Sequence, residues 1–575
     1  MKRKALLIIS AVMTATMIFT SCGQKQKVID NPGKSDTAKV DKKVQETKKA
    51  PNPEKLPQTS KDRKDTLIVG ITAPSGKFNP IYSDSVYDSY VTSLVFDGLM
   101  TNDKEGNPIG LLAEKWDISQ DNKTYTFHLK KGVKFSDGTE LKASDVAFTY
   151  TALCDPKYDG PRVDAAEKLV GFKEYNKGDA KEVSGIKVID DYTISFTLTD
   201  VKAPAIIGDF GYGIMSKNYY GFEKGSIQKL KDLFLKPMGT GAYKFKAYEA
   251  GQTVEFEKND SYFRGAPKIA NIIMKVTNSQ TNIQELKSGG TDMDVIAAKP
   301  ENINMLNEAG FLDLQFYPDN GYSYIGLNLR NDMFKDKKVR QALTYGLNRK
   351  GFVDSYYKGY ADVCNAPMSP VSWAYTEDIE KYDYNAEKAN KLLDEAGWVK
   401  KDDGWRYKDG KKFTIHWLTY TGSKYVDNLV PIVKENWKAI GVEVIPELME
   451  FATLSEKVYD KQEFEMYNMA WSLSIDPDPS GIFAISQDTL GGFNSVGWRN
   501  DEAEKLVQEG LKTTDLEKRK EIYKKWTKMA NDDLPYIFIS QNKDMWAVSS
   551  KVKGIEISPY RDWTYDVWKA EIAAN

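Results

Sequence analysis

The 575-residue chain is poor in the side chains that most catalytic and metal chemistry requires. It has two histidines and three cysteines, which argues against zinc sites, thiol chemistry and histidine-based triads. Its 80 basic residues nearly balance its 82 acidic ones, so it lacks the basic field with which nucleic-acid binders contact phosphates. No GxSxG, HExxH, CxxC or GxxxxGK[ST] motif occurs. We therefore predict no enzyme, no metal and no cofactor.

The chain is instead rich in aromatic side chains. They make up 12% of it, with 33 Tyr and 12 Trp, and such side chains favour surfaces that wrap or stack on a ligand. Strand and helix patterns are intermingled without a repeat or a regular βαβ order, which favours a multi-lobed α/β architecture. Residue periodicity predicts strands over 125–129 and 192–198, and helices over 85–96, 339–347, 389–396 and 429–440.

The N-terminus has the layout of a secretory signal. Basic residues at positions 2–4 precede an apolar run that is shorter than a typical membrane span. The motif Phe-Thr-Ser-Cys at 19–22 resembles the lipobox of bacterial lipoproteins, with Phe in place of the usual Leu. That resemblance implies a signal peptide over 1–21 and acylation of Cys22, with palmitate among the acyl groups. Several acyl chains together anchor a protein stably in a membrane. An ordinary secretory peptide with an incidental cysteine is the alternative.

The segment after the signal is predicted to be a tether. Residues 23–65 contain no Phe, Tyr or Trp and are crowded with Lys, Asp, Gln, Pro and Ser. Such a stretch buries too little apolar surface to offset its chain entropy, so we expect the acylated cysteine and a disordered tether to occupy 22–65. The folded part would begin at residue 66. Beyond it, the sequence leaves open whether Cys154 and Cys364 pair.

Residues 113–150 carry the most specific pattern in the chain. Their sequence, AEKWDISQDNKTYTFHLKKGVKFSDGTELKASDVAFTY, resembles the signature segment of the peptide-binding class of extracellular solute-binding proteins, which serve ABC-type importers. The resemblance covers the chain from about residue 66 to its end. Further matches follow in the family's order: GTGAYKF at 239–245, VRQAL at 339–343, EKA at 387–389, AGW at 396–398 and PYIF at 535–538.

This resemblance implies an α/β fold of the periplasmic-binding-protein type (class II) with three lobes. Lobe II, an extra lobe, would take residues 98–211, and lobe III would take 321–535. Lobes I and III would be joined by two crossovers and would close over a cleft by hinge motion. Lobe I would be discontinuous and would combine residues 66–97, 212–320 and 536–575.

Two segments are expected to form the ligand site. A receptor for many peptides must bind the main chain they share, by strand-like hydrogen bonds. The family's first such edge matches residues 79–86, although these residues are equally compatible with a helix N-cap. The family's aromatic wall in the closing lobe matches Trp471, and Ser472 follows it as a further candidate contact. The alternative is that Trp471 is a core residue at the end of a strand. The candidate contacts in the first segment are Tyr82, Ser83, Asp84 and Ser85.

The second segment departs from the family pattern at one position. Well-studied relatives place an Asp three residues after the Trp, where it pairs with the peptide ammonium, and this chain has Ser474 there. Either Asp476 or Asp478 supplies the anion from a shifted loop, or no fixed ammonium clamp exists. Turn chemistry is the alternative for both acids. Asn494 is a further candidate contact, and five arginines stay open as partners of the ligand carboxylate: Arg264, Arg330, Arg340, Arg349 and Arg499.

Together these patterns predict a lipid-anchored receptor on the outer face of the cytoplasmic membrane. It would capture short peptides and deliver them to the permease subunits of an ABC importer, as a monomer without a nucleic-acid partner. Oligosaccharide cargo stays open, because Trp and Tyr faces also stack on sugars, whereas two histidines disfavour nickel or haem. The sequence is also compatible with a peptide-pheromone sensing receptor and with a surface hydrolase that has two carboxyls in the cleft.

Overall fold

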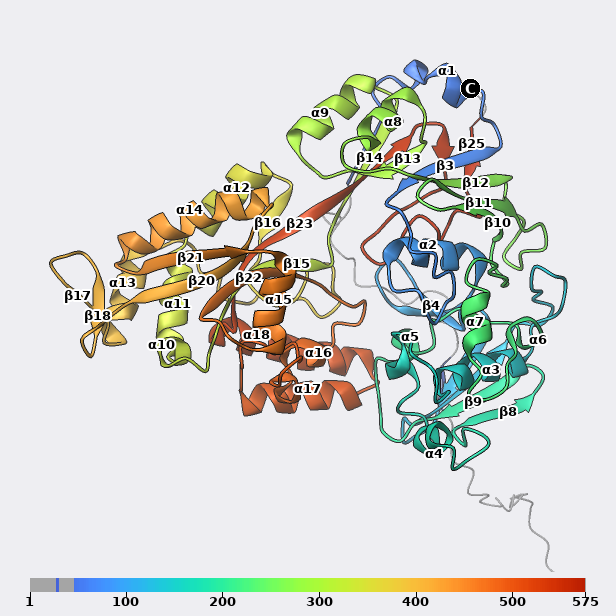
Figure 1. The fold of residues 1–575 in the computed structure, drawn as a ribbon, viewed down its shortest axis with the longest axis horizontal. Helices are drawn as coiled ribbons and strands as arrows, with labels where there is room; N and C mark the ends of the chain where they lie inside the picture. Colours follow the sequence, from blue (N-terminus) through green and yellow to red (C-terminus); the bar gives the residue numbers. More distant parts are fainter. Residues whose placement is uncertain (1–26, 30–45, 574–575) are drawn as a thin grey trace, which may run out of the picture.

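A computed structural model describes residues 27–29 and 46–573 of the chain. The predicted signal peptide, Cys22 and residues 30–45 lie outside the described residues. Three lobes are visible in Figure 1, with lobe I at the upper right, lobe II below it and lobe III on the left. No helix in the described ranges is long and apolar enough to cross a membrane.

Lobes I and III share one mixed β-sheet. Its central path places β3 between β12 and β13, and β23 between β13 and β15. The strands of this path, in spatial order, are β10 (Tyr243–Glu249), β11 (Thr253–Lys258), β12 (Asn271–Val276), β3 (Thr66–Ile71), β13 (Met293–Val295), β23 (Tyr536–Ser549), β15 (Gly321–Leu327), β22 (Met466–Ser472), β20 (Thr414–Tyr420) and β21 (Glu443–Met449). Two short strands and β14 (Leu312–Pro318) branch from it: β2 (Glu46–Lys48) pairs with β14, and β16 (Ala361–Val363) pairs with β23.

The long strand β23 crosses from one lobe to the other (Figure 1). Its first half pairs with β15 of lobe III, where Tyr536 lies opposite Gly326. Its second half pairs with β14 of lobe I, where Trp546 lies opposite Gln315. The predicted boundary before residue 536 is therefore wrong, and the change of lobe falls inside the strand near residue 542. A continuous strand of 14 residues has room for two sets of partners. The other crossover lies between β14 and β15.

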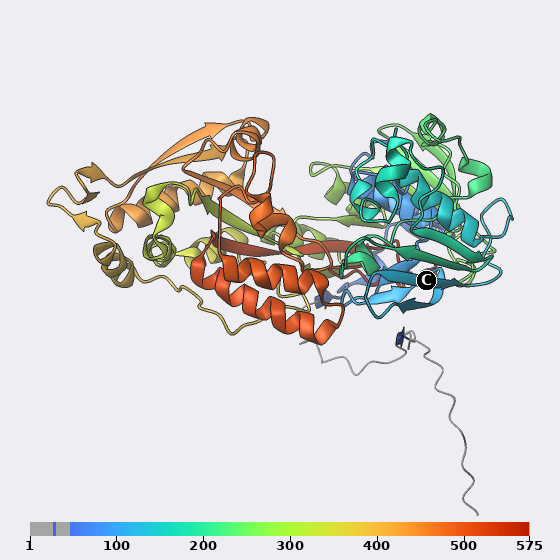
Figure 2. The ribbon, with the colours of Figure 1, turned by 90° about the horizontal axis from the view of Figure 1, so that it is seen from below.

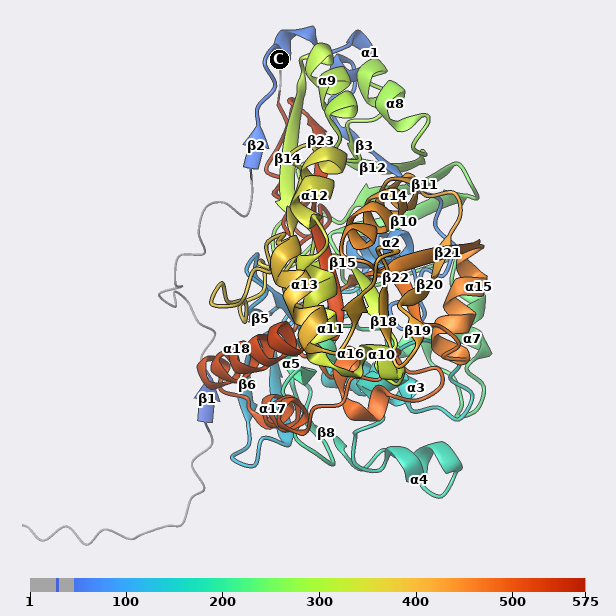
Figure 3. The ribbon, with the colours of Figure 1, turned by 90° about the vertical axis from the view of Figure 1, so that its left-hand side faces the viewer.

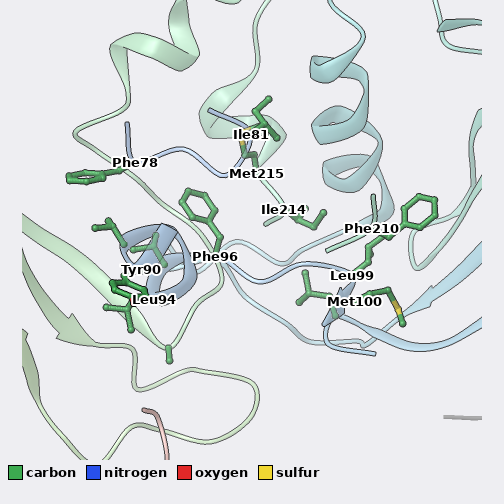
Figure 4. Close-up of a cluster of buried hydrophobic side chains, with 14 of the residues drawn as sticks. Phe78, Ile81, Tyr90, Leu94, Phe96, Leu99, Met100, Phe210, Ile214 and Met215 are labelled. Carbon is green, nitrogen blue, oxygen red and sulfur yellow. The ribbon is translucent and has the colours of Figure 1, made fainter. Parts of the chain in front are cut away.

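Lobe II is built on the sheet β1-β6-β7-β9-β8. The predicted strand over 125–129 is confirmed as β7, whose alternate residues are buried. Lobe II shares one continuous apolar core with lobe I, and Figure 4 shows Phe96, Leu99, Phe210 and Ile214 at that junction. Its elements are β1 (Lys27–Ile29), β4 (Met100–Asn102), β5 (Pro108–Gly110), β6 (Ala113–Ile118), β7 (Thr124–Leu129), α3 (Ala143–Leu153), α4 (Phe172–Lys177), β8 (Ile186–Asp190), β9 (Thr193–Thr197) and α5 (Ala205–Gly208).

Lobe III packs helices around its part of the shared sheet, over a second apolar core. The three helices predicted there are confirmed as α11 (Lys337–Tyr345), α13 (Ala386–Glu395) and α14 (Lys424–Ala439). The antiparallel helices α17 (Asp501–Lys512) and α18 (Leu516–Asp533) lie along one side and reach toward lobe II in Figure 2. There the amide of Ala203 donates to the carbonyl of Leu511 at 2.8 Å. Other helices of this lobe are α10 (Asp332–Lys335), α12 (Arg349–Tyr357), α15 (Phe451–Ser455) and α16 (Ser480–Phe483).

Residues 46–65, expected to belong to a disordered tether, are packed on lobe I. Strand β2 extends the sheet beside β14 (Figure 3), and Leu56, 4% exposed, joins the core beneath α8 (Asn282–Ser288) and α9 (Pro300–Ala309). Buried Asp292 then receives a hydrogen bond from Arg63 at 2.8 Å. The composition was misleading, because these residues add to an existing core and need not form one of their own. The folded part therefore begins at least twenty residues earlier than predicted.

The two cysteines beyond the tether do not pair. Cys154 is buried at the end of α3 in lobe II, and Cys364 is buried in lobe III just after β16. Both are free thiols. Burial raises the pKa of Cys364 to about 11 and also raises the pKa of Cys154, so both thiols are protonated and unreactive in the folded protein.

Candidate ligand-binding site

A pocket of about 360 Å³ lies where the three lobes meet. Its walls come from α2 (Val86–Val95) of lobe I, from residues 98–102 and 211–213 at the junction with lobe II, and from residues 560–568 near the C-terminus. Lobe III contributes Ile475, which follows β22. A concave site of this size between lobes, with convergent polar groups, has the properties of a small-molecule or peptide subsite.

The C-terminal segment over 560–568 forms much of the pocket wall and is missing from the predicted site. The side-chain amide of Asn102, at the end of β4, donates to the carbonyl of Tyr560 at 2.8 Å, and Arg561 Nε donates to the carbonyl of Asn102 at 2.9 Å. Trp563 is buried edge-on against Tyr90 of α2. The only signal in the sequence is the density of aromatic and charged residues in YRDWTYDVW, which does not by itself place the segment beside α2.

The predicted edge over 82–85 serves mainly as the entry to α2. Ser85 is the N-cap, and its hydroxyl accepts from the amide of Asp88. Asp84 pairs with exposed Lys77. Tyr82 is buried against other aromatic rings, so the helix-cap interpretation describes most of this segment. Ser83 lines the pocket, and its carbonyl accepts from Arg162 at 2.9 Å.

Trp471 lies at the end of β22, directly opposite Tyr322 of β15. It is partly exposed, and its ring lies parallel to Tyr324 at 6.2 Å and edge-on to Phe493 at 5.4 Å. The next residue, Ser472, is exposed. The tryptophan thus combines contact with the lobe III core and partial exposure, close to the crossover between the lobes.

The loop after Trp471 is held by lobe III. The side-chain amide of Asn320, at the crossover, donates to the carbonyls of residues 473 and 474 at 3.0 and 2.9 Å, and the side chain of Ser474 is exposed. Asp476 forms a two-point ion pair with Arg519 of α18, with one contact at 2.7 Å. Asp478 accepts from the amide and hydroxyl of Ser480 at 3.0 and 2.6 Å. Both acids are engaged inside lobe III, and it is Ile475, directly before Asp476, that reaches the pocket.

Asn494 is fully buried and its amide is satisfied by the protein. Its side chain donates to the carbonyls of Ala484 and Trp498 and accepts from the amide of Trp498 at 2.9 Å. With 0% exposure and protein partners at both ends, this side chain serves the packing of lobe III in this structure. Contact of Asn494 with ligand stays a prediction.

The structure separates the five arginines that the sequence left open. Arg330 and Arg499 both pair with Asp488, on the outer side of lobe III. Arg340 and Arg349 are buried, and they donate to backbone carbonyls. Arg264 lines the pocket. Of the five, it is the one placed to meet a ligand there.

Acidic groups near the pocket and the crossovers are shifted toward their neutral form. Burial raises the pKa of Asp97, against hydrogen bonds from Thr240 and Tyr262, and burial also raises the pKa of Asp562. At the crossover, burial and then the charge of Asp319 raise the pKa of Asp544 to about 7. The predominant cause is removal from water, which disfavours the charged carboxylate.

The site and fold define a class of protein: a multi-lobed receptor whose ligand pocket lies between lobes joined by two crossovers. Residues 107–492 match the model of the bacterial extracellular solute-binding proteins, family 5. The oligopeptide-binding protein AppA of Bacillus subtilis is 31% identical over 572 residues, with 98% of each chain covered. The chain therefore belongs to this family of solute-binding transport proteins.

Solved structures agree with that assignment. The structure of B. subtilis AppA in complex with a nonapeptide matches 88% of this chain and 99% of its own, with a TM-score of 0.69. NikZ of Campylobacter jejuni in complex with Ni(L-His) matches 88% of this chain and 99% of its own, at 25% identity and a TM-score of 0.70. The α/β periplasmic-binding-protein architecture is thus confirmed.

Proposed function

We propose that this chain is a lipid-anchored receptor that captures short peptides outside the cell and delivers them to an ABC-type permease. The single observation that carries the proposal is the full-length similarity to a relative whose structure holds a nonapeptide. The pocket between the lobes supports it, because Ile475 of lobe III, α2 and the C-terminal segment together line a site that hinge closure can enclose.

The proposed contacts are those groups at the pocket and crossover that retain free binding capacity. Ser83 lines the pocket, Trp471 is partly exposed, and Ser472 and Ser474 are exposed beside it. An extended peptide along this edge would pair with the loop backbone and place alternate side chains against the aromatic wall. Asp476 and Asp478 support the loop in this proposal and leave the ligand without a fixed ammonium clamp from lobe III.

Peptide cargo is favoured over metal chelates and haem within this fold. The two histidines lie away from the pocket, where His128 contacts Asp117 and His416 contacts Glu447. No group of three His, Cys, Asp or Glu residues that could hold a metal occurs in the ranges 27–29 and 46–573. Oligosaccharide cargo is separated from peptide cargo by the identity of the ligand. A peptide-pheromone sensing receptor would differ only in its partner proteins.

Anchoring is proposed through Cys22, at the outer face of the cytoplasmic membrane. The support is the lipobox-like motif at 19–22. In cell fractionation, the wild-type chain should sediment with membranes and Cys22→Ala should be released in soluble form. Equal membrane association of both would contradict the anchor.

Binding is tested on the purified chain after bound ligands have been removed by partial unfolding and refolding. Titration calorimetry with mixed short peptides should show saturable heat, and oligosaccharide mixtures should show none. Trp471→Ala should weaken peptide binding about 10- to 100-fold, because it removes a ring face worth roughly 1.5–3 kcal/mol of burial. Saturable binding of oligosaccharides without peptide binding would refute the proposal.

A further inference from the structure

We propose that the guanidinium groups of Arg264 and Arg561 form a carboxylate-recognition site in this pocket, so that the receptor selects ligands presenting a carboxylate there. The inference rests on the proposed function and names the ligand chemistry of the same site. It assigns a role to two arginines, one of which lies in the C-terminal segment that the sequence left without a role.

Both guanidiniums are held by aromatic faces. Arg264 lies 4.9 Å from the ring centre of Tyr565 and 5.0 Å from that of Trp568. Arg561 lies 3.8 Å from the ring centre of Tyr565 and donates through Nε to the carbonyl of Asn102. Stacking on a ring leaves the N–H groups at the edge of a guanidinium available for hydrogen bonds. Arg264 has one such bond, to the hydroxyl of Tyr262, and the other N–H groups of the two arginines can bind an oxyanion.

The pocket has donors that lack acceptors. In the part of the chain that the structure describes, neither Arg264 nor Arg561 forms an ion pair, and neither does Arg162, which lines the same pocket. Arg162 Nε, the hydroxyl of Tyr560 and the indole N–H of Trp568 are buried without a hydrogen-bond partner. It costs free energy to leave a buried donor without a hydrogen bond. Several such donors around one pocket therefore indicate a ligand rich in acceptors.

Among the described residues, the two acids of the pocket form no ion pair with these arginines, although the charge of Asp97 acts on Arg264. Asp97 accepts from Thr240 at 2.8 Å and Tyr262 at 3.1 Å, and Asp562 accepts from the amide of Thr564 at 2.8 Å. Three arginines against these two acids leave the pocket lining with a positive balance. The loop from lobe III, where the family resemblance expects an anion for a peptide ammonium, contributes exposed Ser474 and apolar Ile475. Where the family resemblance expects an anion that binds the peptide ammonium, the pocket thus favours a negatively charged ligand group.

To test this, the purified protein is incubated with a pool of random nonapeptides, supplied as free acids and as C-terminal amides. The peptides that it retains are quantified by mass spectrometry. Wild-type protein should retain free acids about 10- to 100-fold better than amides if it binds the terminal carboxylate. If an acidic side chain is bound instead, the retained amides should be enriched in Asp and Glu by a similar factor. Arg264→Gln/Arg561→Gln should still retain peptides but lose this preference.

Two further variants separate the site from general effects on folding or charge. Arg499→Gln removes an arginine outside the pocket and should keep the preference. Arg264→Lys keeps the charge and the fold but removes the two-point contact, so it should keep only part of the preference. The carboxylate site is refuted, while the proposed function stands, if wild type retains acids and amides equally without enrichment of Asp or Glu. It is also refuted if the preference survives in the double Gln variant. If wild type retains no peptide, the proposed function fails with it.

Discussion

Replacing Asp476 with Asn separates a structural role for this carboxylate from a role in ligand binding. Its two-point ion pair with Arg519 joins the loop after Trp471 to α18. The side chain of Arg519 is 5% exposed and that of Asp476 is 16% exposed. Arg519 also donates to the carbonyl of Gly510 at 2.9 Å and to the hydroxyl of Tyr523 at 3.1 Å. The substitution thus leaves a buried guanidinium without its anion.

The expected cost follows from that burial. Burial acts to lower the pKa of Arg519, yet the charge and hydrogen bonds of Asp476 outweigh it and the net shift is upward. Removing one partner of a buried pair typically costs about 3–5 kcal/mol, and an Asn that keeps one hydrogen bond reduces this to roughly 2–4 kcal/mol. Lobe III, from residue 321 to the crossover near residue 542, has about 220 residues, and for a unit of this size 1 kcal/mol lowers Tm by roughly 2–4 °C. We expect Tm of this lobe to fall by about 4–16 °C.

Thermal unfolding is monitored by calorimetry. Binding of free-amine and N-acetylated peptides is measured at a temperature well below the unfolding transition. Asp354→Asn is the matched control, because Asp354 pairs with Lys350 on an exposed helix surface and should change stability by less than about 0.5 kcal/mol. Both kinds of peptide should bind Asp476→Asn alike. An unchanged Tm together with a selective loss of affinity for free-amine peptides would refute the structural account and restore Asp476 as the ammonium partner.

Three other predictions concern the N-terminal packing, the crossover and the thiols. Leu56→Ala should destabilise lobe I by about 2–4 kcal/mol in urea unfolding, whereas wild-type stability would place residue 56 in a tether. Because the pKa of Asp544 is raised to about 7 by burial and by Asp319, its contribution to stability is complete below pH 4 and is lost as pH rises through 7. Asp544→Asn should therefore be more stable than wild type by about 1–2 kcal/mol at pH 8 but not at pH 4, and an equal difference at both pH values would contradict this. Cys154 and Cys364 should resist a thiol reagent in the native state and react in urea, and rapid native labelling would contradict their burial.

Local structure was predictable where periodicity reports burial directly. The helix over 429–440 repeats Leu429, Val433 and Trp437 on one face, and these residues are buried in α14. The strand over 125–129 alternates in the same way. The family resemblance then supplied the three-lobed arrangement, because its motifs occur in order along the chain.

Tertiary partners were not predictable from the same patterns. An apolar run such as β23 does not show where its neighbour changes from β15 to β14, so the lobe boundary was placed too early. Asn494 and Asp476 carry groups that suit a ligand, but their partners at Trp498 and Arg519 lie on other segments and are set by packing. Arg561 was missed for the converse reason, since only the fold brings the C-terminal segment beside the pocket.

The most direct measurement is the identity of the molecules that copurify with the full-length protein, released by denaturation and analysed by mass spectrometry. We expect a population of short peptides that present a free carboxylate, at the C-terminus or on Asp and Glu side chains. Recovery of glycans, or of metal chelates, in place of peptides would contradict it.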